Sequence, residues 1–297
     1  MKRFFLIALC IGTTACTFFS NTKETQTPTR GNASVLVDET LFPMVDGQVR
    51  VFENRYPHAR IHIISSPEQL IPTLMRSDSL RIGILTRELT ETERAWFEDK
   101  RIIPRTLPIA YDAIALIVNR NHRDSTITQD ALREMLRGGK GMDHYTLVFD
   151  NPASSTVRYM MEFAKTDSLP GVYSVKSHRE LLEYVAAHPD AIGFTGIDWL
   201  YETDAGQTPF INRIRVLAVG DSTEGYYKPT QNDVAEGKYP FTRKIYIINC
   251  QGTSGLGLGF ASFLASDIGQ RIILKAGLVP VAYPNREIIV RKKLKTK

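Results

Sequence analysis

Short apolar runs alternate with amphipathic helical patterns along most of this chain, and this alternation restricts its fold more than any other feature. Runs typical of buried strands occur at 35–37, 61–64, 82–85, 102–109, 113–118, 146–149, 191–194, 214–219 and 244–248. Helical patterns occur at 42–56, 67–77, after Thr90, and at 128–137, 154–165, 177–187, 258–264 and 268–276. This order predicts α/β architecture, with parallel sheets covered by helices on both faces. Such sheets bind ligands where loops leave the carboxyl ends of strands.

The N-terminus has the pattern of an export signal. Two basic residues precede an apolar stretch, 4–15, which has the length of a signal-peptide hydrophobic region and is too short to span a bilayer. Ala15 precedes Cys16, and a small residue before a cysteine resembles the lipidation site of bacterial lipoproteins. We expect a signal peptide over 1–15, a lipid on Cys16 and a polar tether over 16–32, which would place the domain in the cell envelope facing the periplasm. A plain secretory signal is the alternative.

Charge and cysteine content exclude two other classes of protein. The net charge is +5, but two positive charges lie in 1–15 and five in the basic tail 291–297, so the remainder is near −2. Nucleic-acid binding needs a basic face on the folded domain, and none is indicated. Of the three cysteines, Cys10 would leave with the signal and Cys16 would be acylated. Cys250 would remain alone, so no disulfide scaffold is expected.

Three consecutive hydroxyl residues give the strongest local sign of a binding site. Ser154, Ser155 and Thr156 follow a strand and a turn, and they open an amphipathic helix. The first amides of a helix have no partner within it, and the helix dipole is positive at this end. Hydroxyls beside these amides predict an anion cradle. Simple capping of the helix, which needs only one hydroxyl residue, explains the pattern equally well.

Similar residues follow three strands of the first half. Thr40 and Leu41 follow the first, Ser65 the second, and Thr86 with Arg87 the third. Because equivalent strand ends meet at one edge of a sheet, we expect these segments and 154–156 to converge on one small oxyanion.

The same residues resemble the contact loops of the PstS-like phosphate-binding proteins of bacterial ABC transporters, over roughly 34–280. Ser154-Ser155-Thr156 is similar to the family's Ser-Gly-Thr, Thr40-Leu41 to its first loop, Ser65 to its second and Thr86-Arg87 to its third. Segments at 191–194, 239–246 and 260–280 are also similar to family segments.

The resemblance implies a two-lobed type II periplasmic-binding-protein fold, each lobe a mixed, mainly parallel sheet flanked by helices. Lobe one would comprise 33–118 with 246–290, and lobe two 119–245. The chain would cross between lobes near 118–119 and 244–246. Residues 204–243, rich in Gly, Pro, Asp and Thr, are expected to form irregular connections.

For function, the resemblance implies capture of inorganic phosphate or another tetrahedral oxyanion between the lobes, for uptake through an ABC permease. It implies a monomer without enzymatic activity, cofactor or metal. The expected phosphate ligands are Thr40, Leu41, Ser65, Thr86, Ser154, Ser155 and Thr156.

Two positions depart from the family pattern. Thr86 stands where some members have an Asp that accepts the proton of hydrogen phosphate, and Asp150 stands where the family has an Arg. Arg87 or Arg158 is expected to supply the missing charge, unless each forms a surface or interlobe salt bridge instead. Asp150 is expected either to take part in the site or to cap the turn before the helix.

Two other functions stay open. One is an envelope interaction or sensing protein that keeps this fold and has lost or altered anion binding. The other is an exported hydrolase that acts through Ser154 or Cys250. Ser154 lacks the elbow glycines and the identifiable base of a hydrolase, which disfavours the second.

Overall fold

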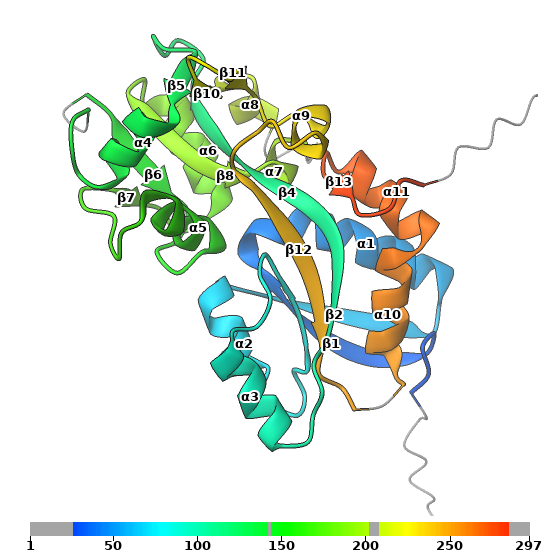
Figure 1. Ribbon diagram of the computed structural model, residues 1–297. Coiled ribbons are helices and arrows are strands. Elements are labelled where there is room, and N and C mark those ends of the chain that lie inside the picture. The colour runs from blue at the N-terminus through cyan, green and yellow to red at the C-terminus, as the bar shows by residue number, and fades with distance from the viewer. Residues whose placement is uncertain (1–25, 142–143, 202–207, 253, 285–297) are drawn as a thin grey trace, which may run out of the picture.

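The computed structural model describes residues 26–141, 144–201, 208–252 and 254–284. The predicted signal peptide, Cys16 and the basic tail lie outside the described residues. Figure 1 shows two lobes joined by two long strands that run side by side, β4 (Arg105–Asn119) and β12 (Thr242–Asn249). None of the described helices is both long and apolar enough to cross a membrane.

The first lobe is built on five strands in the order β2-β1-β3-β12-β4. Besides the two long strands these are β1 (Gly31–Asp38), β2 (Ala59–Ser66) and β3 (Ile82–Leu85). Its helical elements are η1 (Glu39–Leu41), α1 (Phe42–Arg55), η2 (Glu68–Leu70), α2 (Ile71–Leu74), α3 (Glu91–Asp99), α10 (Leu256–Ala265) and α11 (Asp267–Lys275). β1 is parallel to β2 and β3, whereas β12 is antiparallel to β3 and β4.

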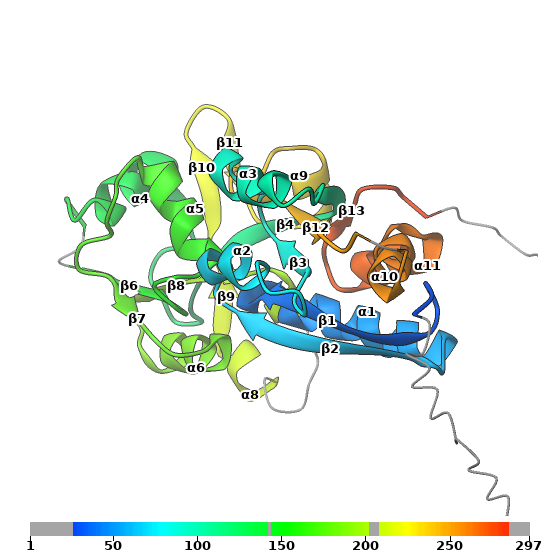
Figure 2. The same ribbon diagram turned by 90° about the horizontal axis from the view of Figure 1, so that it is seen from below.

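Both faces of this sheet are buried, as the alternation predicts. Successive side chains of a strand point to opposite faces, so Val35 and Val37 join the core cluster that contains Phe260 of α10. Leu36 joins a second cluster, with Phe97 of α3. Figure 2 shows the sheet between α2 and α3 on one side and α1, α10 and α11 on the other.

The second lobe continues from the far half of β4 through β8 (Ala191–Gly196) and β6 (Thr146–Phe149) to β7 (Tyr173–Ser174). β6 is parallel to β7 and β8, and β8 is antiparallel to β4. Its helices include α4 (Gln129–Leu136), α5 (Ser155–Ala164), α6 (His178–Ala187) and α7 (Asp198–Tyr201). The sheet is therefore mixed, with antiparallel strands at the crossing and parallel strands outside it.

A single strand replaces the two that the sequence suggested at 102–109 and 113–118. β4 pairs with β12 as far as Ala113 and with β8 from Ile114 onward. β4 therefore changes its pairing partner at 113–114, before the expected crossing near 118–119. One continuous strand belongs to the sheets of both lobes. Pro108 has no N–H to donate to the ladder, and the register between β4 and β12 shifts beside it, between Ile245 and Tyr246. The gap between the two predicted runs, 110–112, contains Asp112, a charged residue in an otherwise apolar stretch.

The prediction of irregular connections over 204–243 is wrong for much of the described part, 208–243, although the strand predicted at 214–219 is present as two short strands. That part contains α8 (Thr208–Ile211), β9 (Ile214–Val216), β10 (Ala218–Asp221), β11 (Gly225–Tyr227) and α9 (Gln231–Ala235). β10 and β11 form a hairpin, and β5 (Thr126–Thr128) completes a three-stranded sheet. Gly225 takes φ 94° at the turn, where glycine is favoured. β13 (Val279–Pro280) pairs with β4.

Candidate functional site

Hydroxyls from both lobes meet at the crossing. Thr40 lies in η1, directly after β1, and Ser155 is the first residue of α5. Their Oγ atoms are 2.8 Å apart, and both residues are buried. The Oδ2 atom of Asp38 accepts hydrogen bonds from both hydroxyls. The expected convergence of the first loop with the α5 helix start is therefore present, with an acidic residue at its centre.

Arg243 supplies a positive charge that the sequence reasoning missed. Its Nη1 donates to Ser155 Oγ at 2.8 Å, and its Nε donates to Asp112 Oδ2 at 2.8 Å. Burial opposes the charge of Arg243, but Asp112 and then Asp38 raise its pKa above the ordinary value. The sequence offered little signal, because Arg243 stands between Thr242 and Lys244 at the polar start of β12; its burial, which is rare for an arginine unless it is paired, is visible only in the structure.

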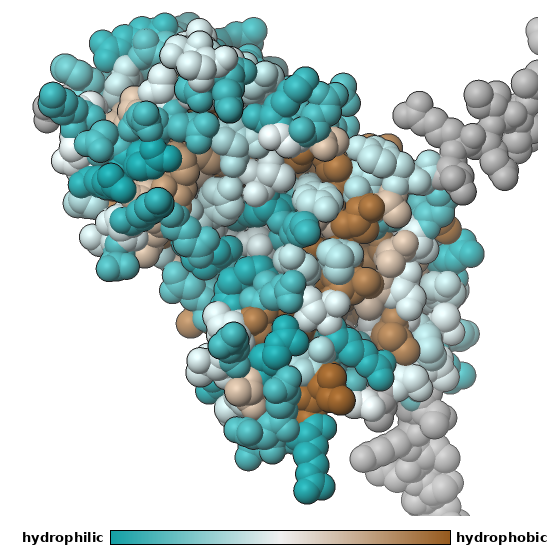
Figure 3. All heavy atoms as spheres, viewed as in Figure 1, coloured by the Kyte–Doolittle hydropathy of each residue, from teal (hydrophilic) through white to brown (hydrophobic). Residues whose placement is uncertain are grey.

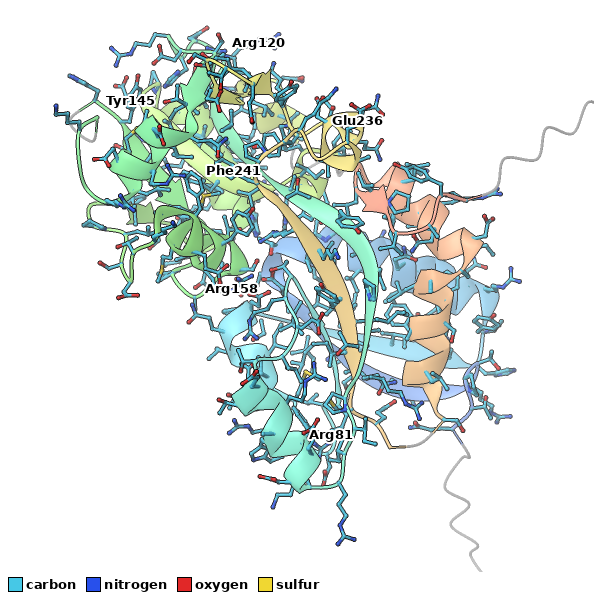
Figure 4. All side chains as sticks on the ribbon, viewed as in Figure 1. Arg81, Arg120, Tyr145, Arg158, Glu236 and Phe241 are labelled. Atoms are coloured by element: carbon cyan, nitrogen blue, oxygen red, sulfur yellow. The ribbon has the colours of Figure 1, made fainter. Side chains whose placement is uncertain are left out.

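A second acidic centre joins the lobes beside the first. Glu68 Oε1 accepts from the amide and the hydroxyl of Thr86, each at 2.7 Å. Arg158 reaches from α5 and places its Nε 2.6 Å from Glu68 Oε2. Figure 4 shows Arg158 at the boundary between α5 and α2. Burial favours the neutral form of Glu68, but Arg158 and Thr86 hold its pKa below the usual range.

The alternative of a salt bridge accounts for both candidate arginines. Arg158 pairs with Glu68 across the lobes and with Glu162 of its own helix. Arg87 donates to both carboxylate oxygens of Glu93, at 2.7 and 2.9 Å. Its Nε is 3.9 Å from Glu68. Neither arginine donates to Thr40 or Ser155 among the described residues, whereas Arg243 donates to the Ser155 hydroxyl.

The hydroxyls of Ser154 and Thr156 at the start of α5 differ in their hydrogen bonding. The Ser154 hydroxyl caps the helix by accepting from Val157 N at 3.3 Å, so the capping alternative holds for this residue. Thr156 Oγ1 is buried and has no hydrogen-bond partner among the described residues. A buried hydroxyl without a partner is costly, so this atom is suited to receive a ligand.

Asp150 is paired with a histidine. Its Oδ2 lies 3.0 Å from His178 Nε2, and the His178 ring stacks on Trp199 at 4.4 Å. Burial acts to raise the pKa of Asp150, but the facing His178 holds it below its usual value. Trp199 Nε1 donates to the Thr40 carbonyl at 3.0 Å, which links this pair to the first lobe.

Two other predicted residues occupy different positions from those expected. Ser65 is exposed, whereas Ser66 is buried and lies opposite Asp38 in the β1–β2 register. The side chain of Ser65 therefore points to the other face of the sheet, and Ser66 replaces it on the face of the site. Leu41 is fully buried in the core, so only its backbone is suited to contact a ligand.

Two buried acids of the site, Asp38 and Asp198, have raised pKa values. Burial, followed by the charge of Glu68, raises the pKa of Asp38 to about 7. Burial, followed by the charge of Asp112, raises the pKa of Asp198 well above its ordinary value. The charges of Glu68 and Asp112 are paired with those of Arg158 and Arg243.

This raised pKa predicts how stability changes with pH. Asp38 binds its proton more tightly in the folded than in the unfolded chain, so its contribution is complete below about pH 4 and disappears as pH rises through about 7. We expect the unfolding free energy of the native chain, relative to Asp38→Asn, to fall by at most about 1.4 kcal/mol per pH unit over this window. Urea unfolding at four pH values measures it. Parallel profiles for the two proteins would contradict the assignment.

The described residues of the site offer hydrogen-bond donors to an anion. No group of three or more His, Cys, Asp and Glu residues able to hold a metal occurs in the part of the chain that the structure describes. Cys250 is buried in the first lobe, and burial raises its pKa to about 12. A thiol with that pKa is protonated at neutral pH and is a poor nucleophile.

A groove of about 480 Å³ lies away from this cradle, between α10 and the paired strands β4 and β12. Leu107, Ile247 and Leu258 help to line it. Figure 3 shows hydrophobic residues gathered on this part of the surface. Its mostly apolar lining does not suit a small oxyanion, so the buried cradle remains the candidate site.

Comparison with known proteins matches this chain to a domain family and to proteins that are described as phosphate-binding. A family model described as a PBP superfamily domain matches residues 22–267. The phosphate-binding protein PstS of Pseudomonas aeruginosa is 24% identical over 278 residues, which cover 84% of this chain and 83% of that protein. A solved structure from Clostridium perfringens, described as a phosphate ABC transporter substrate-binding protein with bound phosphate, aligns with a TM-score of 0.71 and 18% identity. It covers 85% of this chain and 100% of that chain.

An ABC-type phosphate transport receptor from Vibrio cholerae aligns with a TM-score of 0.63 and 17% identity, over 84% of this chain and 100% of that chain. At this identity, the two solved structures establish the shared fold alone.

Proposed function

The chain belongs to the PBP superfamily, and on that premise we propose that it is an extracytoplasmic solute-binding protein that captures phosphate between its lobes for ABC-type uptake. The single observation that carries this proposal is the buried junction of Thr40, Ser155 and Arg243. These groups come from the first lobe, the second lobe and the crossing strand. Donors from separate lobes that meet in one dry place suit a ligand that closes the lobes around itself.

The backbone amides and side-chain hydroxyls at the start of α5 and in η1 are the kinds of donor that bind a small oxyanion. The amides of Ser155 and Thr156 are at the first turn of α5 and have no partner within that helix. The Thr156 hydroxyl is buried without a partner, and the Thr40 and Ser155 hydroxyls point to the same carboxyl. A helix N-terminus with added hydroxyls replaces the water around an anion. We propose that phosphate accepts from these groups, with Ser66 in place of Ser65.

Arg243 offers the charge that Asp150 cannot. The guanidinium lies 2.8 Å from Ser155 Oγ and carries a permanent charge, since its pKa is raised by Asp112 and Asp38 against the effect of burial. Hydrogen bonds from an ionised donor to an oxyanion are about twice as strong as neutral ones. Arg158, which bonds Thr86 and Glu68 across the lobes, would hold the lobes together rather than bind the ligand.

The lobes and the cellular setting complete the proposal. The strand pairing supports lobe boundaries at 113–114, where β4 changes partner, and just before β12.

We propose a signal peptide over 1–15, a lipid on Cys16 that anchors a periplasm-facing monomer, and delivery of phosphate to an ABC permease. The protein would perform no covalent chemistry, because Ser154 caps a helix and the Cys250 thiol is buried.

Thermal unfolding tests the proposed function. Protein beginning after Cys16 should gain about 2.7 kcal/mol of stability at a ligand concentration one hundred times the Kd, which raises Tm by roughly 5 °C or more for a chain of this size. Phosphate, sulfate and molybdate should be compared at equal ionic strength, with chloride as the control. Unchanged melting curves with all three oxyanions at millimolar concentration would contradict oxyanion capture.

One observation favours a second candidate function. Asp38 and Glu68 already accept hydrogen bonds from Thr40, Ser155 and Thr86, so internal carboxylates use the groups that an anion needs. This arrangement suits an envelope interaction or sensing protein that keeps the fold with altered anion binding. Calorimetry with the three oxyanions separates the candidates, because only the transport protein should bind one of them tightly.

A further inference from the structure

The Asp38 carboxyl occupies the part of the site that an oxyanion oxygen would use. Its Oδ2 accepts from the Thr40 and Ser155 hydroxyls, and these two hydroxyls are themselves 2.8 Å apart. Asp38 is fully buried, so water does not screen its charge from a ligand in the same place. An ionised Asp38 beside an oxyanion would put two negative charges on one pair of donors, which is strongly unfavourable at low dielectric.

The charged groups that face Asp38 do not remove this conflict. Glu68 of η2 acts on Asp38 with a like charge and favours its neutral form. Arg243 of β12 acts in the opposite direction. The guanidinium already donates from Nε to Asp112 Oδ2 at 2.8 Å, and its Nη2 lies 2.7 Å from the same oxygen, so its charge is largely balanced.

Asp198 and Arg158 also bring no free positive charge to the cradle. Asp198 of α7 is fully buried, and its neutral form is favoured by burial and by Asp112 of β4. Arg158 of α5 is engaged by Glu68 and Glu162. An entering anion therefore finds no uncompensated cation among the described residues of the cradle. One negative charge has to be neutralised when the ligand binds, and Asp38 is the acid in direct contact with the ligand-binding hydroxyls.

From this geometry we infer that the protein takes up one proton on Asp38 for each oxyanion that it binds, so that its ligand is an oxyanion together with a proton. The proton comes from the solvent, and no other bond forms or breaks. Protonated Asp38 changes from a competitor for the Thr40 and Ser155 hydroxyls into a hydrogen-bond donor toward the anion. This inference rests on the proposed function and adds a pH dependence to it. The pKa of Asp38, raised to about 7, sets the pH range in which the effect is visible.

Calorimetry in buffers of different ionisation enthalpy tests the inference directly. Molybdate and sulfate do not titrate between pH 6 and 9, so any proton taken up when they bind goes to the protein. For the wild-type chain we expect uptake of about one proton per anion at pH 8 and almost none at pH 5. Phosphate is measured in the same way, and its own titration is removed by comparison with Asp38→Asn. Binding by the wild type at pH 8 without proton uptake would overturn the inference, even if the variant fails to fold.

Two variants test whether Asp38 is the residue that takes up the proton. Asp38→Asn keeps the shape and the capping oxygen of Asp38 but cannot titrate. Relative to this variant, the wild-type Kd should rise about tenfold per pH unit above pH 7. Glu39→Gln is the matched control, because Glu39 also lies between the lobes but bonds Asn151 instead of the cradle hydroxyls. It should keep the wild-type proton uptake.

The outcomes separate this inference from the proposed function. Equal proton uptake by wild type and Asp38→Asn, with both binding, overturns the inference and leaves the proposed function standing. Loss of the extra proton in Glu39→Gln moves the assignment away from Asp38 and also overturns it. Failure of all three proteins to bind any oxyanion overturns the proposed function and the inference together.

Discussion

Replacement of Arg243 by methionine is expected to abolish oxyanion binding and to lower the free energy of unfolding by about 3–5 kcal/mol, the usual cost of breaking a buried ion pair. Arg243 bonds both Asp112 and Ser155 in the buried cradle. Without the guanidinium, Asp112 is left as a buried charge, and the cradle loses the cation in contact with Ser155. Urea unfolding measures the stability, and calorimetry with phosphate measures the binding.

A double variant separates the two consequences of this change. Arg243→Met with Asp112→Asn removes both charges, so most of the lost stability should return. Binding should stay absent, because no guanidinium remains beside Ser155 to donate a hydrogen bond to the anion. Recovery of binding in the double variant would show that Arg243 serves only to neutralise Asp112, and our assignment of its role would be wrong.

The second large effect is expected from Ser155→Ala with Thr156→Ala. Each hydroxyl is expected to donate one hydrogen bond to a charged ligand, worth about 1.5–3 kcal/mol, so the Kd for phosphate should rise at least about 100-fold. The loss of stability should come from Ser155, whose hydroxyl bonds Asp38 and Arg243, because Thr156 Oγ1 has no partner to lose among the described residues. Isothermal titration with phosphate gives the change in Kd.

The matched control for this pair is Thr128→Ala, which removes a hydroxyl from another helix start in the same lobe. Thr128 caps α4 by accepting from Ala131 N at 3.1 Å, outside the cradle. It should cost about 1 kcal/mol of stability and leave the Kd unchanged. A double variant that binds phosphate like the wild type would move the site away from the α5 helix start.

Local sequence patterns predicted most of the secondary structure. The Thr90 and Glu93 spacing marks a capping box that the structure contains, and the three hydroxyl residues mark the start of α5. These signals work because capping and apolar periodicity involve residues within about one helical turn. The resemblance to PstS-like proteins then indicated the fold, and the family match and solved structures confirm it.

The partners within the site were not predictable in this way. Asp38, Glu68 and Arg243 were not singled out, because each matters through contacts with residues distant in the sequence. Ser155 is 117 positions from Asp38, and Arg243 is 131 positions from Asp112. Ser65 was predicted from its likeness to the second loop of the PstS-like family, whereas the structure leaves Ser65 exposed and buries Ser66 opposite Asp38.

The sequence alone therefore determined the order of strands and helices, the helix starts and the hydroxyl residues that the lobes bring to the crossing, since these depend on short-range periodicity and capping. Only the tertiary structure decided which charges accompany them. β4 and β12 carry Asp112 and Arg243 to the junction, and closure sets Asp38 against Ser155. The physical reason is that the electrostatic energy of a buried group depends on its distance from charges on other segments and on the loss of water around it. Neither can be calculated from the residues that neighbour it in the sequence.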